Sequence, residues 1–147
     1  MNYLFDTNIV LFYIKDWKVR QLINKNHKPF KNGNKALLSI VTIGELKSLA
    51  QRNQWSAKRV QELKDFLGRF IIINISSEPL LNAYADIENF SQGKHQTLKL
   101  KTSARNMGKN DLWIAATTFI TKSKLITMDK DFSHLDTIYF ELILMER

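Results

Sequence analysis

The sequence predicts an α/β fold in which a mainly parallel sheet of four to five strands lies between two layers of helices. Short apolar runs alternate with helical patterns along the chain, as in repeated strand–helix units. One run, residues 70–75, is continuously apolar and β-branched, as expected for a parallel strand covered on both faces. The length of 147 residues and the hydrophobic content of 44% suit a single domain, residues 1–147, with one core.

The first half of the chain predicts two strand–helix units. Thr7 or Asn8, directly after the first apolar run, is the expected N-cap of the first helix. Thr42 and Glu45 have the spacing of a capping box, which places a helix start directly after the second strand. The expected elements are a strand at residues 2–5, helices at 9–14 and 17–24, a loop at 28–34, a strand at 36–41, a helix that ends near residue 52, and a further helix at 56–67.

The second half continues this pattern around one long polar segment. Residues 93–108 show no clear periodicity, and long irregular segments in compact domains are often functional. Asn110 is the expected N-cap of the helix that follows. The expected elements are a strand at residues 70–75, a helix at 78–90, a helix at 110–121, a strand at 124–127 and a last strand at 138–142.

The composition excludes several kinds of site. The chain has no cysteine, which rules out disulfides, thiolate zinc sites and a cysteine nucleophile, and its three histidines are too scattered to form a ligand set. No apolar run reaches the ~18 residues of a membrane span, and the N-terminus runs into Asp6 without the features of a signal peptide. We therefore expect a cytoplasmic protein with no membrane association, in which any metal is held by oxygen atoms.

The charge favours a polyanionic partner. The net charge is +8, from 22 Lys and Arg against 14 Asp and Glu, which suits nucleic acid. Six basic residues gather before Asp111, and a second basic stretch covers residues 25–35. The second stretch is equally well explained as a solvated loop. The members of the first group are Lys94, His95, Lys99, Lys101, Arg105 and Lys109.

Four acidic residues lie at or near the ends of predicted strands. Asp6 and Asp129 directly follow strands, Glu45 lies within a turn of one, and Asp111 opens the helix before the strand at 124–127. In an open parallel sheet, ligands bind outside the carboxyl ends of the strands, so these acids are expected to converge. Several carboxylates in one crevice repel each other unless a cation or protons neutralise them. An all-oxygen site favours Mg²⁺ or Mn²⁺, although each acid taken singly is also explained as a helix cap.

These acids lie in four short motifs whose order and spacing resemble a known family. The motifs are LFDTN at residues 4–8, TIGEL at 42–46, KNDLWIAA at 109–116 and TMDKDF at 127–132. Together they resemble the PIN-domain nucleases, especially the small VapC-like toxins of bacterial toxin–antitoxin pairs. The resemblance covers nearly the whole chain. It implies a parallel sheet with helices on both faces, metal-dependent ribonuclease activity, and catalytic metal ligands at Asp6, Glu45, Asp111 and Asp129.

Neighbouring residues are expected to support this site. Thr7 is placed to hydrogen-bond a ligand carboxylate or a metal-bound water. Thr127 begins a Thr-x-Asp pattern that resembles the family's, and this resemblance favours Asp129 over Asp131 as a ligand. Asp131 is then an outer ligand or the cap of the short turn at residues 132–134. The residues expected to hold the RNA backbone are Lys101, Arg105, Lys109 and Asn110.

The sequence thus predicts an endoribonuclease that hydrolyses RNA with one or two Mg²⁺ or Mn²⁺ ions, and a DNA substrate stays open. The resemblance also implies a cognate antitoxin and a homodimer. A phosphatase of the haloacid dehalogenase type is one alternative, but it needs a second Asp where this chain has Asn8. A metal-free module that binds RNA or protein on the same fold is the other, and the presence of all four acids argues against it.

Overall fold

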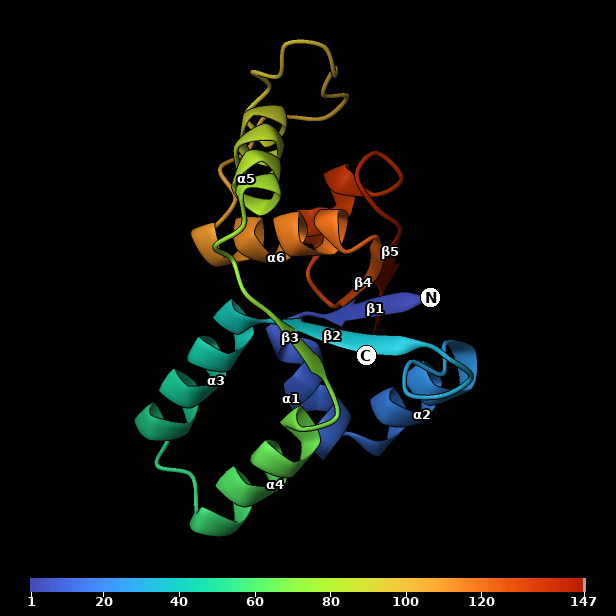
Figure 1. Cartoon of the computed structure of the whole chain (residues 1–147), viewed down its shortest axis with the longest axis vertical. Coiled ribbons are helices and arrows are strands. Elements are labelled where there is room, and N and C mark those ends of the chain that lie inside the picture. Colours follow the sequence, from blue (N-terminus) through green and yellow to red (C-terminus); the bar gives the residue numbers. More distant parts are fainter. Residues whose placement is uncertain (147) are drawn as a thin grey trace.

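A computed structural model, which describes residues 1–146, shows a five-stranded sheet with helices packed on both faces (Figure 1). All neighbouring strands are parallel, and their order is β3-β2-β1-β4-β5. This confirms the predicted fold class. The elements are β1 (Asn2–Phe5), α1 (Thr7–Lys15), α2 (Trp17–Asn26), β2 (Lys35–Ser39), α3 (Ile40–Arg52), α4 (Ala57–Leu67), β3 (Ile71–Ile73), α5 (Glu78–Ser91), α6 (Lys109–Ile120), β4 (Ser123–Thr127), the 3-10 helix η1 (Lys130–Leu135) and β5 (Leu142–Leu144).

The sheet divides the core into two clusters, because successive side chains of a strand point to opposite faces. From β1, Tyr3 and Phe5 pack among the side chains of helices α1 to α4, whereas Leu4 packs against α5, α6 and η1. In the central strands, Leu4 lies beside Leu37 of β2 and Leu125 of β4. Burial on both faces explains why β1, β2 and β4 are short apolar runs.

The start of α3 differs from the prediction. Residues 40 and 41 were assigned to a strand but form the first turn of α3, because the Ser39 hydroxyl accepts the Val41 N–H at 3.1 Å and caps the helix. The capping box predicted from Thr42 and Glu45 is therefore wrong. Glu45 lies in the second turn of α3 rather than the first, so the helix dipole does not account for its presence.

Two strands also differ from the prediction. β3 is an edge strand that pairs only with β2, and Ile71 and Ile72 are exposed, so coverage on both faces was wrong. The last strand is β5 at Leu142–Leu144 instead of residues 138–142, since the chain turns at Thr137, where φ is +66°, and Ile138 is exposed. Residues 93–108 are irregular, as predicted. No helix within residues 1–146 is long and apolar enough to cross a membrane.

Candidate metal centre

The candidate site lies where the strand order reverses. From β1 the chain proceeds to β2 and β3 on one side, and β4 and β5 then add on the other side of β1. The carboxyl ends of β1 and β4 are therefore adjacent and outline the crevice in which open α/β sheets bind ligands. Asp6 follows β1, and Asp129 follows β4 after one intervening residue.

Asp6 is fixed by hydrogen bonds on both carboxylate oxygens. Its Oδ1 accepts the Thr7 N–H at 2.8 Å, and its Oδ2 accepts the Thr127 hydroxyl at 2.7 Å. Asp6 itself is the N-cap of α1, so the expectation that Thr7 or Asn8 caps this helix was wrong. With only 5% of its surface exposed, Asp6 is buried at the carboxyl end of β1.

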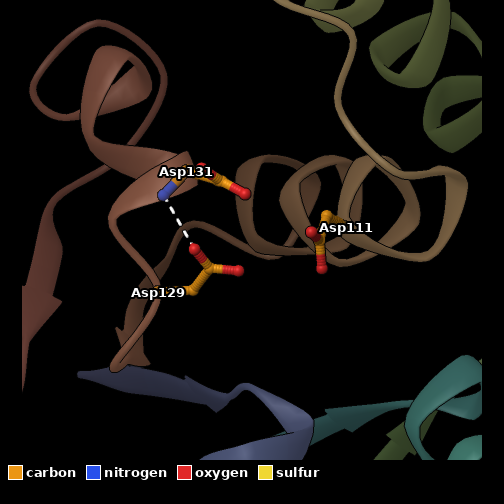
Figure 2. Close-up of side chains that lie close together, drawn as sticks. All are labelled: Asp111, Asp129 and Asp131. Atoms are coloured by element: carbon orange, nitrogen blue, oxygen red, sulfur yellow. Dashed lines mark hydrogen bonds between the residues drawn. The ribbon is translucent and has the colours of Figure 1, made fainter.

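Thr127 also connects Asp6 to the loop after β4. Its Oγ1 accepts the Asp129 N–H at 3.0 Å, and the Asp129 carboxylate accepts the Asp131 N–H at 2.8 Å (Figure 2). Asp129 is therefore the residue that caps η1, and the alternative expectation that Asp131 caps this turn was wrong. The same short loop presents two carboxylates from alternate positions.

Three further carboxylates lie close together near Asp6. Each of Asp111, Asp129 and Asp131 offers an oxygen atom within 4.8 Å of the others (Figure 2). Asp111 lies in the first turn of α6, as predicted, but the N-cap of that helix is Gly108, not Asn110, and no side chain caps it. Two of the three had been predicted as ligands, whereas Asp131 had been assigned a supporting position.

Glu45 joins the site from α3 through Thr7. The Thr7 hydroxyl donates to Glu45 Oε1 at 3.0 Å and lies 3.0 Å from the Thr42 hydroxyl, which can donate to it in turn. Thr7 and Thr127 thus each hold one carboxylate in place. This is a useful arrangement for metal ligands, because hydrogen bonds to a ligand fix its orientation.

Two carboxylates of the site, Asp6 and Asp111, have a raised pKa. Burial raises the pKa of Asp6, the hydrogen bonds from Thr127 and Thr7 oppose that rise, and the charges of Glu45 and Asp129 add to it. Burial is also the main reason why the pKa of Asp111 rises from 3.8 to about 7, and the neighbouring acids Asp6, Asp129, Glu45 and Asp131 contribute in that order. Five carboxyl groups thus share one field that favours a cation or protons.

This donor set fits a hard divalent cation. All the nearby ligand atoms are carboxylate or hydroxyl oxygens, and crowding already disfavours the fully ionised state without a cation. Mg²⁺ and Mn²⁺ prefer such oxygen ligands. The chemistry of the site therefore agrees with the metal predicted from the sequence.

The residues expected to bind RNA are not all near the carboxylates. Arg105 approaches the loop, since its Nη1 donates to the Asp131 carbonyl at 3.5 Å. Lys109 and Asn110 are exposed in the first turn of α6, next to Asp111. Lys101 is exposed in the irregular segment, and no contact within residues 1–146 brings it to the cluster.

Two clusters that no sequence pattern indicated lie beside this segment, and the first of them binds it directly. The Asp86 carboxylate on α5 bonds both His95 Nε2 at 2.8 Å and the Tyr139 hydroxyl at 2.6 Å, while His95 Nδ1 accepts the Leu98 N–H at 2.9 Å. In the second cluster, His134 Nε2 lies 2.7 Å from the Ser91 hydroxyl, and burial lowers the pKa of His134 to about 4. The partners are far apart in the chain, so only the fold reveals them.

Comparison with known proteins places the chain in a family. The model of the PIN domain family matches residues 3–138. Ribonuclease VapC2 of Haemophilus influenzae is 26% identical over 116 residues, which cover 79% of this chain and 77% of that protein. The structure of VapBC-1 from nontypeable Haemophilus influenzae aligns with a TM-score of 0.74 at 24% identity, covering 97% of this chain and 96% of that one. VapBC2 from Rickettsia felis, bound to a promoter DNA fragment, gives 0.72 at 22% identity and 97% coverage of both chains.

Proposed function

The chain belongs to the PIN domain family, and on this basis we propose that it is an endoribonuclease that hydrolyses RNA phosphodiester bonds with Mg²⁺ or Mn²⁺. The observation that carries this proposal is the convergence of Asp111, Asp129 and Asp131 near the buried Asp6. Capping alone does not require acids from three separate parts of the chain to meet at one sheet edge. Residues 1–147 form a single PIN-like domain in this proposal.

The carboxylates are the proposed catalytic and metal-binding residues. Asp6, Glu45, Asp111 and Asp129 hold the cation directly or through water, and Asp131 completes the set because of its distance to Asp111 and Asp129. Thr7 and Thr127 keep Glu45 and Asp6 oriented. The carboxylates would hold a divalent ion, whose Lewis acidity would polarise the phosphate and lower the pKa of a water molecule that serves as the nucleophile.

Basic side chains position the RNA. Arg105 is held beside the Asp131 carbonyl, and Lys109 begins α6 two residues before Asp111, so both can contact phosphates that flank the scissile one. Lys101 contacts the strand further from the carboxylates. Phosphate contacts of this kind fix the register of the strand and do not read its sequence.

The proposed biological role is that of the toxin in a toxin–antitoxin pair. Several solved structures with this fold contain a toxin and its antitoxin, among them VapBC-1 and VapBC2. The cognate antitoxin of this chain would be a protein that covers the carboxylate crevice, and the active form of the toxin would be a homodimer. The existence of an antitoxin is proposed from the likeness to those complexes, and its position over the carboxylates and the homodimer are proposed from the resemblance of the sequence motifs to the toxin family.

The test is cleavage of a single-stranded RNA by the purified protein in Mg²⁺, Mn²⁺ or EDTA. If a water molecule attacks the scissile phosphorus in line, the fragments should carry 5′-phosphate and 3′-hydroxyl ends. Cleavage should be absent in EDTA and absent in Asp6→Asn. Asp65→Asn is the matched control, since Asp65 is an exposed acid on α4 outside the crevice. Cleavage that persists in EDTA or in Asp6→Asn would refute the mechanism, and equal cleavage of a DNA strand of the same sequence would refute the RNA assignment.

A further inference from the structure

A groove opens beside the carboxylates, between α3 and α6. Its volume is about 580 Å³, within the ~300–1,000 Å³ typical of ligand sites. One side of α3, the first residues of α6 and Ile75 of the β3–α5 connection form its walls. The two helices contact each other beside the sheet edge that carries the acids (Figure 1).

The groove is continuous with the carboxylate cluster. Glu45 belongs to both, because it lines the groove and accepts the Thr7 hydroxyl beside Asp6. Asn110, which also lines the groove, directly precedes Asp111. A strand whose phosphate lies over the carboxylates therefore reaches the groove with its next nucleotide.

Arg52 places a positive charge at the far end of the groove. Arg52 lies seven residues after Glu45 on the same side of α3, which places it ~10 Å further along the helix axis. Within residues 1–146, its guanidinium has no hydrogen bond or ion pair. A guanidinium without such partners can bind a phosphate through two parallel hydrogen bonds.

The walls offer an apolar surface and free space. Trp113 is half-buried and is held against Tyr84, with ring centroids 4.1 Å apart, and Ile75 lies on the same groove. Gly44 adds no side chain, and a Cβ atom at this position would meet no atom within 4 Å. A nucleic acid base can contact such a surface whatever its identity, because aromatic side chains accept the face of any base.

From these features we propose that the groove is a nucleotide subsite for single-stranded RNA, in which Arg52 binds the phosphate of a nucleotide that flanks the scissile bond and Trp113 and Ile75 contact its base. The strand must be single because a base reaches such a wall only when it is unstacked and unpaired. This inference rests on the proposed ribonuclease function and assigns part of its substrate specificity.

The experiment measures binding and cleavage separately. Binding of a fluorescently labelled single-stranded oligoribonucleotide is followed in EDTA, where cleavage does not interfere. Arg52→Gln should weaken binding about tenfold and lower the slope of log affinity against log salt by ~0.7, the value for one phosphate contact to a single strand. Gly44→Phe should weaken binding about tenfold by filling the groove, since stacking of one base is worth ~1–3 kcal/mol, or roughly five- to 150-fold.

Two variants on the same helix are the controls. Lys47→Gln removes an exposed charge outside the groove, and Gly44→Ala adds only a methyl group where there is space. Both should bind within about twofold of wild type. In cleavage with metal, Arg52→Gln and Gly44→Phe should raise KM and leave kcat nearly unchanged, because neither residue touches the reacting atoms.

Two outcomes would overturn the proposal in different ways. If Arg52→Gln and Gly44→Phe bind RNA as tightly as wild type and the two controls do, the groove is not a subsite. Cleavage by the wild-type protein would still support the ribonuclease function. If the wild-type protein neither binds nor cleaves RNA, the proposed function fails and the subsite fails with it. Circular dichroism and thermal melting of each variant show that a loss of binding is not a loss of fold.

Discussion

The raised pKa of Asp111 predicts that removing its charge stabilises the metal-free protein. Its carboxyl group ionises at about pH 7 in the folded chain, compared with 3.8 ordinarily, because it is partly buried among four other acids. Below pH 3.8 the group is neutral in both states and costs nothing. Between pH 3.8 and about 7 the unfolded chain is ionised at this position while the folded chain still holds the proton, so folding stability falls with rising pH and levels off above about pH 7.

The magnitude follows from these two values. The difference between 3.8 and about 7 corresponds to ~4 kcal/mol without screening. Asp111 is only partly buried, and water screens its charge, so we expect ~1–2 kcal/mol. Asp111→Asn should therefore raise the melting temperature by about 2–8 °C at pH 8 in EDTA, by roughly half as much at pH 5.5, and hardly at all near pH 4.

The assay is thermal unfolding in EDTA at these three pH values, with Asp65→Asn as the control. Asp65 is exposed on α4 and accepts only the Gln61 amide, so its variant should differ from wild type by less than ~0.5 kcal/mol at every pH. Burial lowers the pKa of His134 to about 4, so this histidine lowers folding stability as the pH falls below 6.5. The effect is the same in wild type and in both variants, and it cancels when their melting temperatures are compared.

Addition of Mn²⁺ provides a second readout. A cation that binds only the folded state raises the melting temperature by mass action, and the rise should be larger at pH 8, where Asp111 need not lose a proton first. The rise should shrink in Asp111→Asn. If Asp111→Asn were no more stable than wild type at pH 8, or if its gain were the same at all three pH values, the carboxylates would not be crowded as the structure indicates.

Three further predictions concern the hydrogen bonds and charges around the site. Thr127→Val leaves the Asp6 carboxylate and the Asp129 N–H without their partner. It should therefore lower the free energy of unfolding in urea by about 1–3 kcal/mol, whereas Thr127→Ser should not. Equal stability of the two variants would contradict this reasoning. Changing Lys101, Arg105 and Lys109 together to Ser should lower the salt slope of RNA binding by up to ~2, and an unchanged slope would identify residues 93–108 as a solvated loop. His95→Ala removes the hydrogen bonds to Asp86 and Leu98. Trypsin should then cut residues 93–108 faster, with little change in the melting temperature. Unchanged cleavage rates would show that these hydrogen bonds do not hold the segment.

Local patterns in the sequence were sufficient for the order of most elements. The strands at β1, β2 and β4 and the helices from α1 to α6 follow from apolar periodicity, because a buried face imposes its spacing on the chain whatever lies opposite. Errors arose where an apolar run had two explanations. Ile40 and Val41 continue the pattern of β2, yet the Ser39 cap assigns them to α3.

The position of a strand in the sheet does not follow from its composition. The isoleucines of β3 predict a central strand, but it forms the edge, because sheet order depends on how the crossover helices pack and not on the strand itself. The last strand likewise starts four residues later than its apolar pattern suggested, since Thr137 turns the chain.

For the candidate site, local patterns in the sequence predicted that Asp6, Glu45, Asp111 and Asp129 lie near strand ends or helix starts at one edge of a parallel sheet. The proximity of Asp131 to Asp111 and Asp129, and the hydrogen bonds of Asp86 to His95 and Tyr139, became visible only in the folded chain. The placement of strand ends is a local property, fixed within a few residues by periodicity and turns. Distances between side chains from different elements depend on the packing of the whole domain, which no local pattern contains.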